Sequence, residues 1–421
     1  MLTPDYLYRI TEGAEDIASQ LHANILQKII ERMMIRIGRG EDYLLTATDK
    51  WQIEVLQEAG YLLEDIQKEL SDKTKKQVKE IQEAMEDAGV QALQWDDKIY
   101  QAAGLSPVPL LQSPALMRIM QRNYEATAGE WRNFTRTTAN EAQRLFINQM
   151  DNAYNMVVSG AVSYTEAVRD VINDVSEVGM KVNYPSGYKL SIESATMMIV
   201  RTGISQAAAE VGLARMIEHG VGYALTSSHM GARPTHQPWQ GKVFSIDWDT
   251  MKQLKPELFT GNEELPQPDK KYPDFVESTR FGYVDGLCGA NCRHSFSAFY
   301  PGISTNPFEQ YDSEENRKAY ETQQRQRTLE RRIRDSKRKV QNLQTAVDNC
   351  KDEKLKFELQ QKLDRKSYTL SKQNKAYKQY CKDNNLKEYA ERLKVAKWDR
   401  QQAAKAAGAS KRYSISKGGT A

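Results

Sequence analysis

Five residues in two short segments have side chains that can bind a metal ion. His229 and His236 lie in the first segment, and Cys288, Cys292 and His294 lie in the second. A zinc ion takes about four ligands from thiolates and imidazoles, arranged as a tetrahedron. The Cys-x3-Cys-x-His spacing supplies three donors, and His236 or His229 would complete the shell. The sequence therefore predicts a candidate structural zinc site.

The same residues allow two other interpretations. They can pack and hydrogen-bond around a loop without an ion, where an asparagine such as Asn291 caps a turn. They can also serve a hydrolytic enzyme. Cys288 or Cys292 beside a histidine would be a peptidase nucleophile, and His236, Asn291 and His294 would suit a metal-dependent nuclease. The spacing demands neither reaction, so we expect no catalytic residue and no small-molecule substrate.

Both segments border predicted strands that follow a long helix over 191–219. The predicted strands cover 221–225, 242–246 and 295–300. The two segments are loops between these strands, where the backbone can bring distant side chains together. Arg201 and Thr202 lie in the helix. If the helix packs on the sheet, Arg201 would anchor the loops through charge-assisted hydrogen bonds to their carbonyls.

The parts of the chain on either side of this core are predicted to be helical. Apolar residues recur with a 3.6-residue period before the core, and from Leu329 they follow the 4-3 spacing of a coiled coil. The predicted fold class is α+β, mostly α. Its predicted regions are an N-terminal helical region at 1–105, a second helical region at 106–180, a small α+β core at 181–302, a basic helical hairpin or coiled coil at 313–405 and a disordered tail at 406–421.

Charge is distributed unevenly along the 421 residues, whose net charge is only +3. Residues 313–421 contain 29 Lys and Arg against 14 Asp and Glu, and the preceding part has a net charge of −12. A basic run of this kind contacts phosphates or forms the solvated face of a coiled coil. The candidates for DNA contact are Arg331, Arg332, Arg334, Lys337, Arg338 and Lys339.

Several classes of protein are excluded by the composition. The first residues have no basic region followed by an apolar run, so we expect no secretory signal. The most apolar stretch, around 197–217, carries Arg201, Glu210 and Arg215, so we expect no membrane span. Four cysteines in a chain of this length do not form a disulfide scaffold.

The order of the motifs resembles that of a known family. An Arg-Thr helix and a strand precede a His-x6-His loop that leads to Trp-Gln-Gly-Lys-Val-Phe, and Asn-Cys-Arg-His precedes a later strand. This order resembles the head-morphogenesis domain of tailed-phage minor capsid proteins, the Mu F-like group. It is most similar to the minor capsid protein 2 family, whose C-terminal helical region the segment 324–334 also resembles. The matching residues outside the predicted ligands are Arg201, Thr202, Trp239, Gly241, Lys242, Asn291 and Arg293.

The resemblance implies a structural protein of the phage head, assembled in the host cytoplasm and present in few copies near the portal. Members of the family are linked to head assembly and to the passage of DNA. The implied partners are the portal protein, the major capsid protein and, through the basic C-terminal region, phage DNA. The family's second motif usually ends in Asn-Cys-Arg-Cys, and His294 stands in the last position here, which keeps a metal ligand. A hydrolytic enzyme and a DNA-binding module are the alternatives.

Overall fold

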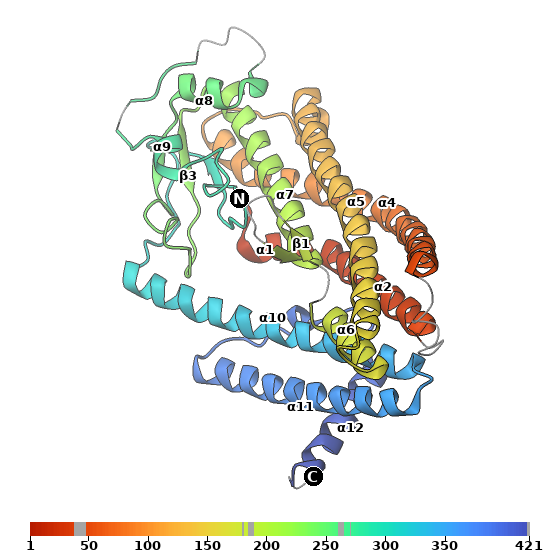
Figure 1. The fold of residues 1–421 in the computed structure, drawn as a ribbon. Coiled ribbons are helices and arrows are strands. Elements are labelled where there is room, and N and C mark those ends of the chain that lie inside the picture. Colours follow the sequence, from red (N-terminus) through yellow and green to blue (C-terminus); the bar gives the residue numbers. More distant parts are fainter. Residues whose placement is uncertain (38–47, 179–180, 184–188, 260–264, 270, 419–421) are drawn as a thin grey trace. The chain divides into compact units, whose positions relative to one another are not determined.

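The computed structural model of the chain is mostly helical (Figure 1). It describes all residues except 38–47, 179–180, 184–188, 260–264, 270 and 419–421. Helix accounts for 71% of the structure, which also contains a three-stranded antiparallel sheet. The predicted α+β, mostly α class is therefore confirmed. Among the described helices, none has the length and hydropathy needed to cross a bilayer.

The helices and strands of the described residues have the following bounds. The α-helices are α1 (Pro4–Arg9), α2 (Glu12–Ile37), α4 (Thr48–Ala102), α5 (Pro114–Val158), α6 (Tyr164–Val178), α7 (Ile192–Glu218), α8 (Trp248–Leu254), α9 (Phe275–Thr279), α10 (Ser313–Asn349), α11 (Glu353–Asp383) and α12 (Arg400–Ser416). Short 3-10 helices are η1 (Leu110–Gln112), η2 (Pro256–Leu258) and η3 (Glu391–Leu393). The strands are β1 (Lys181–Asn183), β2 (Lys189–Ser191), β3 (Tyr223–Thr226), β4 (Val243–Ser245) and β5 (Phe296–Ala298).

The chain forms two compact units, and each is built from several segments. Unit 1 consists of Met1–Glu15, Lys75–Arg132 and Thr196–Gln323. Unit 2 consists of Asp16–Thr74, Asn133–Ala195 and Gln324–Ala421. The helices α2, α4, α5, α7 and α10 each contribute residues to both units. The boundaries of the units therefore lie inside long continuous helices, and the five consecutive regions of the sequence analysis remain a prediction.

The sheet of unit 1 has the order β4-β3-β5, with β3 antiparallel to both neighbours. Ala224 of β3 pairs with Phe244 on one side and Ala298 on the other, and all three are buried. Thr226, the last residue of β3, pairs with Phe296, the first residue of β5. The loop after β3 and the loop before β5 therefore leave the sheet from the same edge.

A buried carboxylate connects α5 and α7 within unit 1. Glu210 of α7 is 4% exposed. It accepts hydrogen bonds from Arg122 at 2.6 Å and Asn123 at 2.7 Å, both in α5, and from Lys255 at 2.6 Å, just after α8. A buried charge is tolerated when opposite charges and hydrogen bonds surround it in this way. The same helices approach closely at Gly203, where a Cβ atom would lie 2.2 Å from the hydroxyl of Thr127.

In unit 2, α10 and α11 form a helical hairpin (Figure 1). The Tyr377 hydroxyl donates to Glu330 at 3.3 Å, which joins the two helices within one chain. Of the apolar residues in the predicted coiled-coil seam, Leu329 is half-buried, and Ile333, Val340, Leu343, Val347 and Cys350 are buried. Asp352 caps the second helix by accepting from the N–H of Leu355 at 2.7 Å. The predicted C-terminal hairpin is therefore confirmed.

Residues 406–418 differ from the predicted disordered tail at 406–421, whose last residues, 419–421, lie outside the described part of the chain. Helix α12 continues to Ser416. Asp399 caps it by accepting from the N–H of Gln402 at 2.7 Å, and the alanine-rich sequence that follows has high helix propensity. Ala406 and Ala409 are buried, and Arg412 pairs with Asp364 of α11 at 2.7 Å. Packing of α12 on α11 thus orders residues whose composition alone indicated a flexible end.

Candidate metal centre and basic groove

The two loops that leave the sheet edge bring three of the predicted metal ligands together. Pairing continues beyond the strands, where the Ser227 N–H donates to the carbonyl of Ser295 at 2.8 Å. The side chains of His236, Cys292 and His294 converge just past this point, and their donor atoms all lie within 4.8 Å of one another. Each of the three residues is only 2% exposed.

The three donor atoms form a compact triangle. The Nδ1 atoms of His236 and His294 are 3.4 Å apart. The Cys292 Sγ atom lies 3.8 Å from each of these nitrogens. The Sγ atom also accepts a hydrogen bond from the backbone N–H of His294 at 3.4 Å. The chain therefore presents two imidazole nitrogens and one sulfur to a single point.

The outer nitrogens of the two imidazoles face oxygen acceptors. The Nε2 atom of His236 lies 2.9 Å from the carbonyl oxygen of Asp285, and that of His294 lies 3.1 Å from Oε1 of Gln240. The same Gln240 oxygen accepts from the backbone N–H of His229 at 3.0 Å, which fixes the orientation of the amide. Both imidazoles therefore carry their proton on Nε2 when neutral and have a bare Nδ1.

The other two predicted ligands border the cluster without joining it. The ring of His229 stacks on that of His294, with the centroids 4.3 Å apart, and its own Nδ1 faces the Met230 carbonyl at 3.3 Å. The Cys288 Sγ atom lies 3.8 Å from the carbonyl oxygen of His294. His229 is half-buried, whereas Cys288 is fully buried.

Residues that the sequence reasoning missed hold the two loops in place. The Arg233 guanidinium donates to the carbonyl of Ala290 at 3.0 Å, which is the anchoring role that was expected of Arg201. The Asn316 side chain, at the start of α10, accepts from the N–H groups of Gly231 at 2.9 Å and Ala232 at 3.0 Å. It also donates to the carbonyl of Ala232 at 2.9 Å. No local pattern marks these roles, because the partners lie far apart in the sequence.

The motif residues surround the cluster in different ways. The ring of Trp239 packs against the imidazoles of His236 and His294, with centroids 4.7 and 4.8 Å away. Gly241 has a φ of 65°, and its carbonyl accepts from Asn306 and Gln310. The remaining motif residues are placed as follows: Lys242 is exposed and donates to the Pro238 carbonyl, Asn291 is exposed with a φ of 58°, Arg293 is half-buried, and Arg201 and Thr202 are half-buried in α7.

Burial controls the protonation of the cluster. It lowers the pKa of His236 to about 4 and holds the pKa of His294 well below its usual value. Burial also raises the pKa of the Cys288 and Cys292 thiols. A nucleophilic cysteine needs an accessible thiolate, and neither sulfur is accessible or readily ionised here. Burial of both sulfurs is therefore unfavourable for attack on a substrate by either cysteine.

The candidates for DNA contact in α10 fall into two groups. Arg338 pairs with the buried carboxylate of Glu193 at 2.7 Å, and the same carboxylate lies 2.9 Å from Nδ1 of His22. Arg334 and Lys337 donate to the backbone carbonyls of the segment before α12, at 2.8 and 2.6 Å. These three cations stabilise unit 2 itself. Arg331 and Arg332 are exposed, and Lys339 is half-buried.

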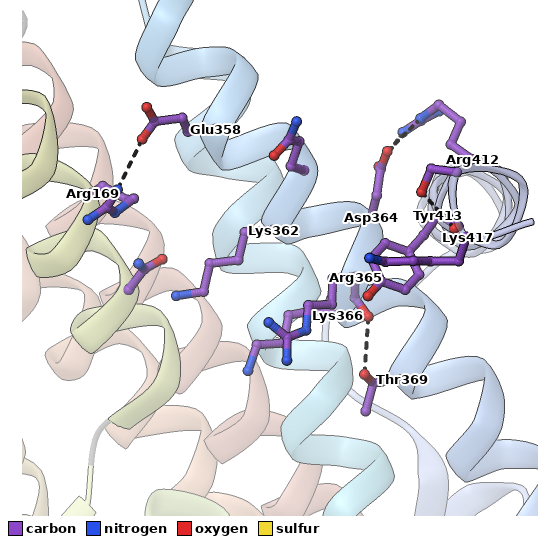
Figure 2. Close-up of a pocket in the computed structure, with 13 residues that line it drawn as sticks. Arg169, Glu358, Lys362, Asp364, Arg365, Lys366, Thr369, Arg412, Tyr413 and Lys417 are labelled. Carbon is purple, nitrogen blue, oxygen red and sulfur yellow. Dashed lines mark hydrogen bonds and ion pairs between the residues drawn. The ribbon is translucent and has the colours of Figure 1, made fainter.

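A second basic surface lies in unit 2 between α6, α11 and α12 (Figure 2). It is a groove of about 1170 Å³. The cations that line it are Arg169, Lys362, Arg365, Lys366, Arg412 and Lys417. Its two carboxylates are already paired, Glu358 with Arg169 at 3.4 Å and Asp364 with Arg412 at 2.7 and 3.0 Å. This surface, which we call the basic groove, has a net positive charge that the sequence reasoning did not locate.

Comparison with known proteins identifies the family of the chain. A protein named "Structural protein" from Lactococcus phage LL-H is 26% identical over 202 residues, which cover 48% of this chain and 50% of that protein. The chain thus matches about half the length of this relative. No solved structure matches the chain. The family model described as phage minor capsid protein 2 matches residues 2–403, which is nearly the whole sequence. The chain therefore belongs to the phage minor capsid protein 2 family.

Proposed function

We propose that this minor capsid protein is a structural component of the phage head that contacts packaged DNA through the basic groove of unit 2. Membership of the family supports the role in the virion. The groove supports the contact with DNA, because its six cations outnumber its two carboxylates. Both carboxylates are paired inside the groove, and the groove keeps a net positive charge that attracts an anionic partner.

The chemistry of the groove suits a phosphodiester backbone. Lys362, Arg365 and Lys366 follow one another along α11, and Figure 2 shows them between α6 and α12. Cations in such a row neutralise successive phosphates and release condensed counterions. Contacts to phosphates carry no sequence information, so we expect the contact to be independent of DNA sequence. Such binding suits a protein that must act on any packaged genome.

Salt dependence of DNA binding tests this proposal. We expect the full chain to bind double-stranded DNA with a log–log slope of about −0.9 per phosphate contacted. Replacing Lys362, Arg365 and Lys366 by glutamine should make the slope shallower by about 2.7. The measurement is fluorescence anisotropy of labelled DNA at several salt concentrations.

A matched variant removes the same charge elsewhere. Replacing Arg331, Arg332 and Lys339 by glutamine takes three cations from α10 and leaves the groove intact. We expect this variant to bind as the parent does. Binding that is insensitive to salt would contradict the proposal, as would a loss of slope in the α10 variant instead of the groove variant.

The partners of the protein in the particle are also part of the proposal. A minor capsid protein assembles with other virion proteins, and we assign the portal protein and the major capsid protein as those partners. The expected result is a low copy number in purified particles and copurification with the portal protein. Mass spectrometry of purified particles measures the first and affinity purification the second. Absence of this protein from purified particles would refute the assignment of its partners.

A non-catalytic role of the His/Cys cluster completes the proposal. His236, Cys292 and His294 are each 2% exposed, so a substrate would not reach them. The cluster joins two loops at one sheet edge, which is a structural task. Separate Cys292→Ala and His236→Ala variants should melt at a lower temperature than the parent. A variant that folds as well as the parent and abolishes a measurable hydrolysis would contradict this role.

A further inference from the structure

We propose that unit 1 binds one Zn²⁺ ion through Nδ1 of His236, Sγ of Cys292 and Nδ1 of His294. The ion would join the loop after β3 to the loop before β5. This inference concerns how unit 1 is stabilised, so it is independent of any contact with DNA. Four observations carry it: the spacing of the donor atoms, the direction of the imidazole protons, the burial of the group and a second thiol beside it.

The spacing of the donor atoms matches the edges of a zinc tetrahedron. With Zn–N of about 2.0–2.1 Å and Zn–S of about 2.3 Å, tetrahedral angles place two nitrogens about 3.4 Å apart and a nitrogen and a sulfur about 3.6 Å apart. The observed separations are 3.4 Å between the nitrogens and 3.8 Å from the sulfur to each nitrogen. The three donors therefore need to move by only a few tenths of an ångström to hold the ion.

The imidazole protons point away from this centre. The Asp285 carbonyl and the Gln240 amide oxygen each accept the Nε2 proton of one histidine. Such outer hydrogen bonds are the usual support of metal-bound histidines. Two bare Nδ1 atoms then face each other at 3.4 Å, and the Cys292 thiol proton could satisfy only one of them. A cation satisfies both at once.

The ion would also account for the buried cysteine. A thiolate is stabilised by a metal and by backbone N–H groups, and the His294 N–H already donates to Sγ of Cys292. Structural zinc sites are closed by four protein ligands. We assign the fourth position to Cys288, the second buried thiol beside the cluster; its sulfur lies outside the triangle of donor atoms, 3.8 Å from the His294 carbonyl oxygen, so its side chain must turn to reach the ion. His229 is instead turned toward the Met230 carbonyl and covers the ring of His294.

Metal content and cobalt spectroscopy test the site in the full chain. Protein purified without chelator from zinc-supplemented cells should contain about one zinc per chain by elemental analysis. Replacement by Co²⁺ should give the intense visible bands of a tetrahedral ion and a sulfur-to-cobalt charge-transfer band. Absence of zinc, or a cobalt spectrum typical of six oxygen ligands, would overturn the proposal.

Substitutions distinguish the ligands from other buried cysteines. The Cys292→Ser variant should lose the metal, whereas Cys350→Ser, which changes a buried cysteine of unit 2, should keep it. The Cys288→Ser variant should lose about half of the charge-transfer intensity; full intensity would overturn the assignment of the fourth ligand. Gln240→Leu removes an outer hydrogen bond and should weaken zinc binding about 10- to 100-fold.

Some of these variants will be informative only if they fold. A measurement on the parent protein does not depend on the folding of the variants. Titration of its thiols with an organomercurial should release zinc to a colorimetric chelator in step with modification of Cys288 and Cys292. Release that follows modification of Cys350 or Cys381 instead would refute the site.

Discussion

The pairing of Arg338 with Glu193 predicts that this arginine stabilises unit 2 rather than contacting DNA. The two side chains are 11% and 3% exposed, and their charged atoms are 2.7 Å apart. Replacing Arg338 by methionine preserves much of the buried stem and removes the charge. The carboxylate of Glu193 then remains buried and keeps its 2.9 Å contact with Nδ1 of His22.

The expected cost follows from the burial of the pair. Removing one partner of a buried ion pair costs about 3–5 kcal/mol because the other charge is left uncompensated. We expect the lower end, about 3 kcal/mol, since the arginine retains some exposure and His22 remains 2.9 Å from the carboxylate. This free energy corresponds to a change of about 150-fold in a local opening equilibrium, at about 1.4 kcal/mol for each factor of ten.

Hydrogen exchange measures the local opening equilibrium of the backbone around Arg338 and Glu193. Amides at the start of α7 and around residue 338 in α10 should exchange about 150-fold faster in the Arg338→Met variant. Arg332→Met is the control, because Arg332 is exposed on the same helix and its loss should change stability by less than about 0.5 kcal/mol. An Arg338→Met variant with parental exchange rates and weakened DNA binding would refute the reasoning.

Three further predictions concern unit 1. Burial raises the pKa of Asp96 to about 7, so the folded state keeps a proton that the unfolded chain releases near pH 4. The parent should therefore lose about 2–3 kcal/mol of folding stability, relative to the Asp96→Asn variant, as the pH rises from about 5 to about 8. Urea unfolding at each pH measures this difference. The groups facing Asp96 include the amino group of Met1, Asp97, Tyr100, Arg215 and the N–H of Ala298. Glu210→Ala should destabilise unit 1 by about 2–4 kcal/mol, less than a fully buried pair would, because Arg122 is 39% exposed; an unchanged melting temperature would contradict this. Gly203→Ala should reduce stability by about 1–3 kcal/mol because the added methyl group overpacks the contact with Thr127. Gly60→Ala is the control, because Gly60 has open space around it and the substitution should leave stability unchanged or raise it slightly. Thermal melting compares the two variants.

Local sequence signals predicted the helices and strands well where turn residues or caps mark their ends. Helix α5 begins at Pro114 because proline suits a first helical turn and the Ser113 hydroxyl accepts from the N–H of Leu116. The region at 1–105 was predicted only to be helical, and its residues from Thr48 to Ala102 form the single helix α4. No proline interrupts that stretch, and tertiary packing decides its length.

The sequence predicted which types of residue form the candidate site, but it did not predict which of the five candidates come together. Spacing near the strands identified His236, Cys292 and His294, and the antiparallel register of β3 and β5 explains why they meet. Side-chain direction decides that His229 stacks on the cluster instead of joining it, and spacing carries no information about direction. For the same reason a run of charges did not reveal that Arg338 is paired with Glu193, which lies far away in the sequence.

The register of β3 with β5 also has a consequence for folding. His236 and Cys292 are separated by a long stretch of chain, and the pairing of Thr226 with Phe296 brings their two loops together. Contacts between residues so distant in sequence form slowly, because the intervening loop must close first. Capture of an ion by this cluster would then be among the last steps of folding in unit 1, and the rate of metal uptake would report when the sheet has formed.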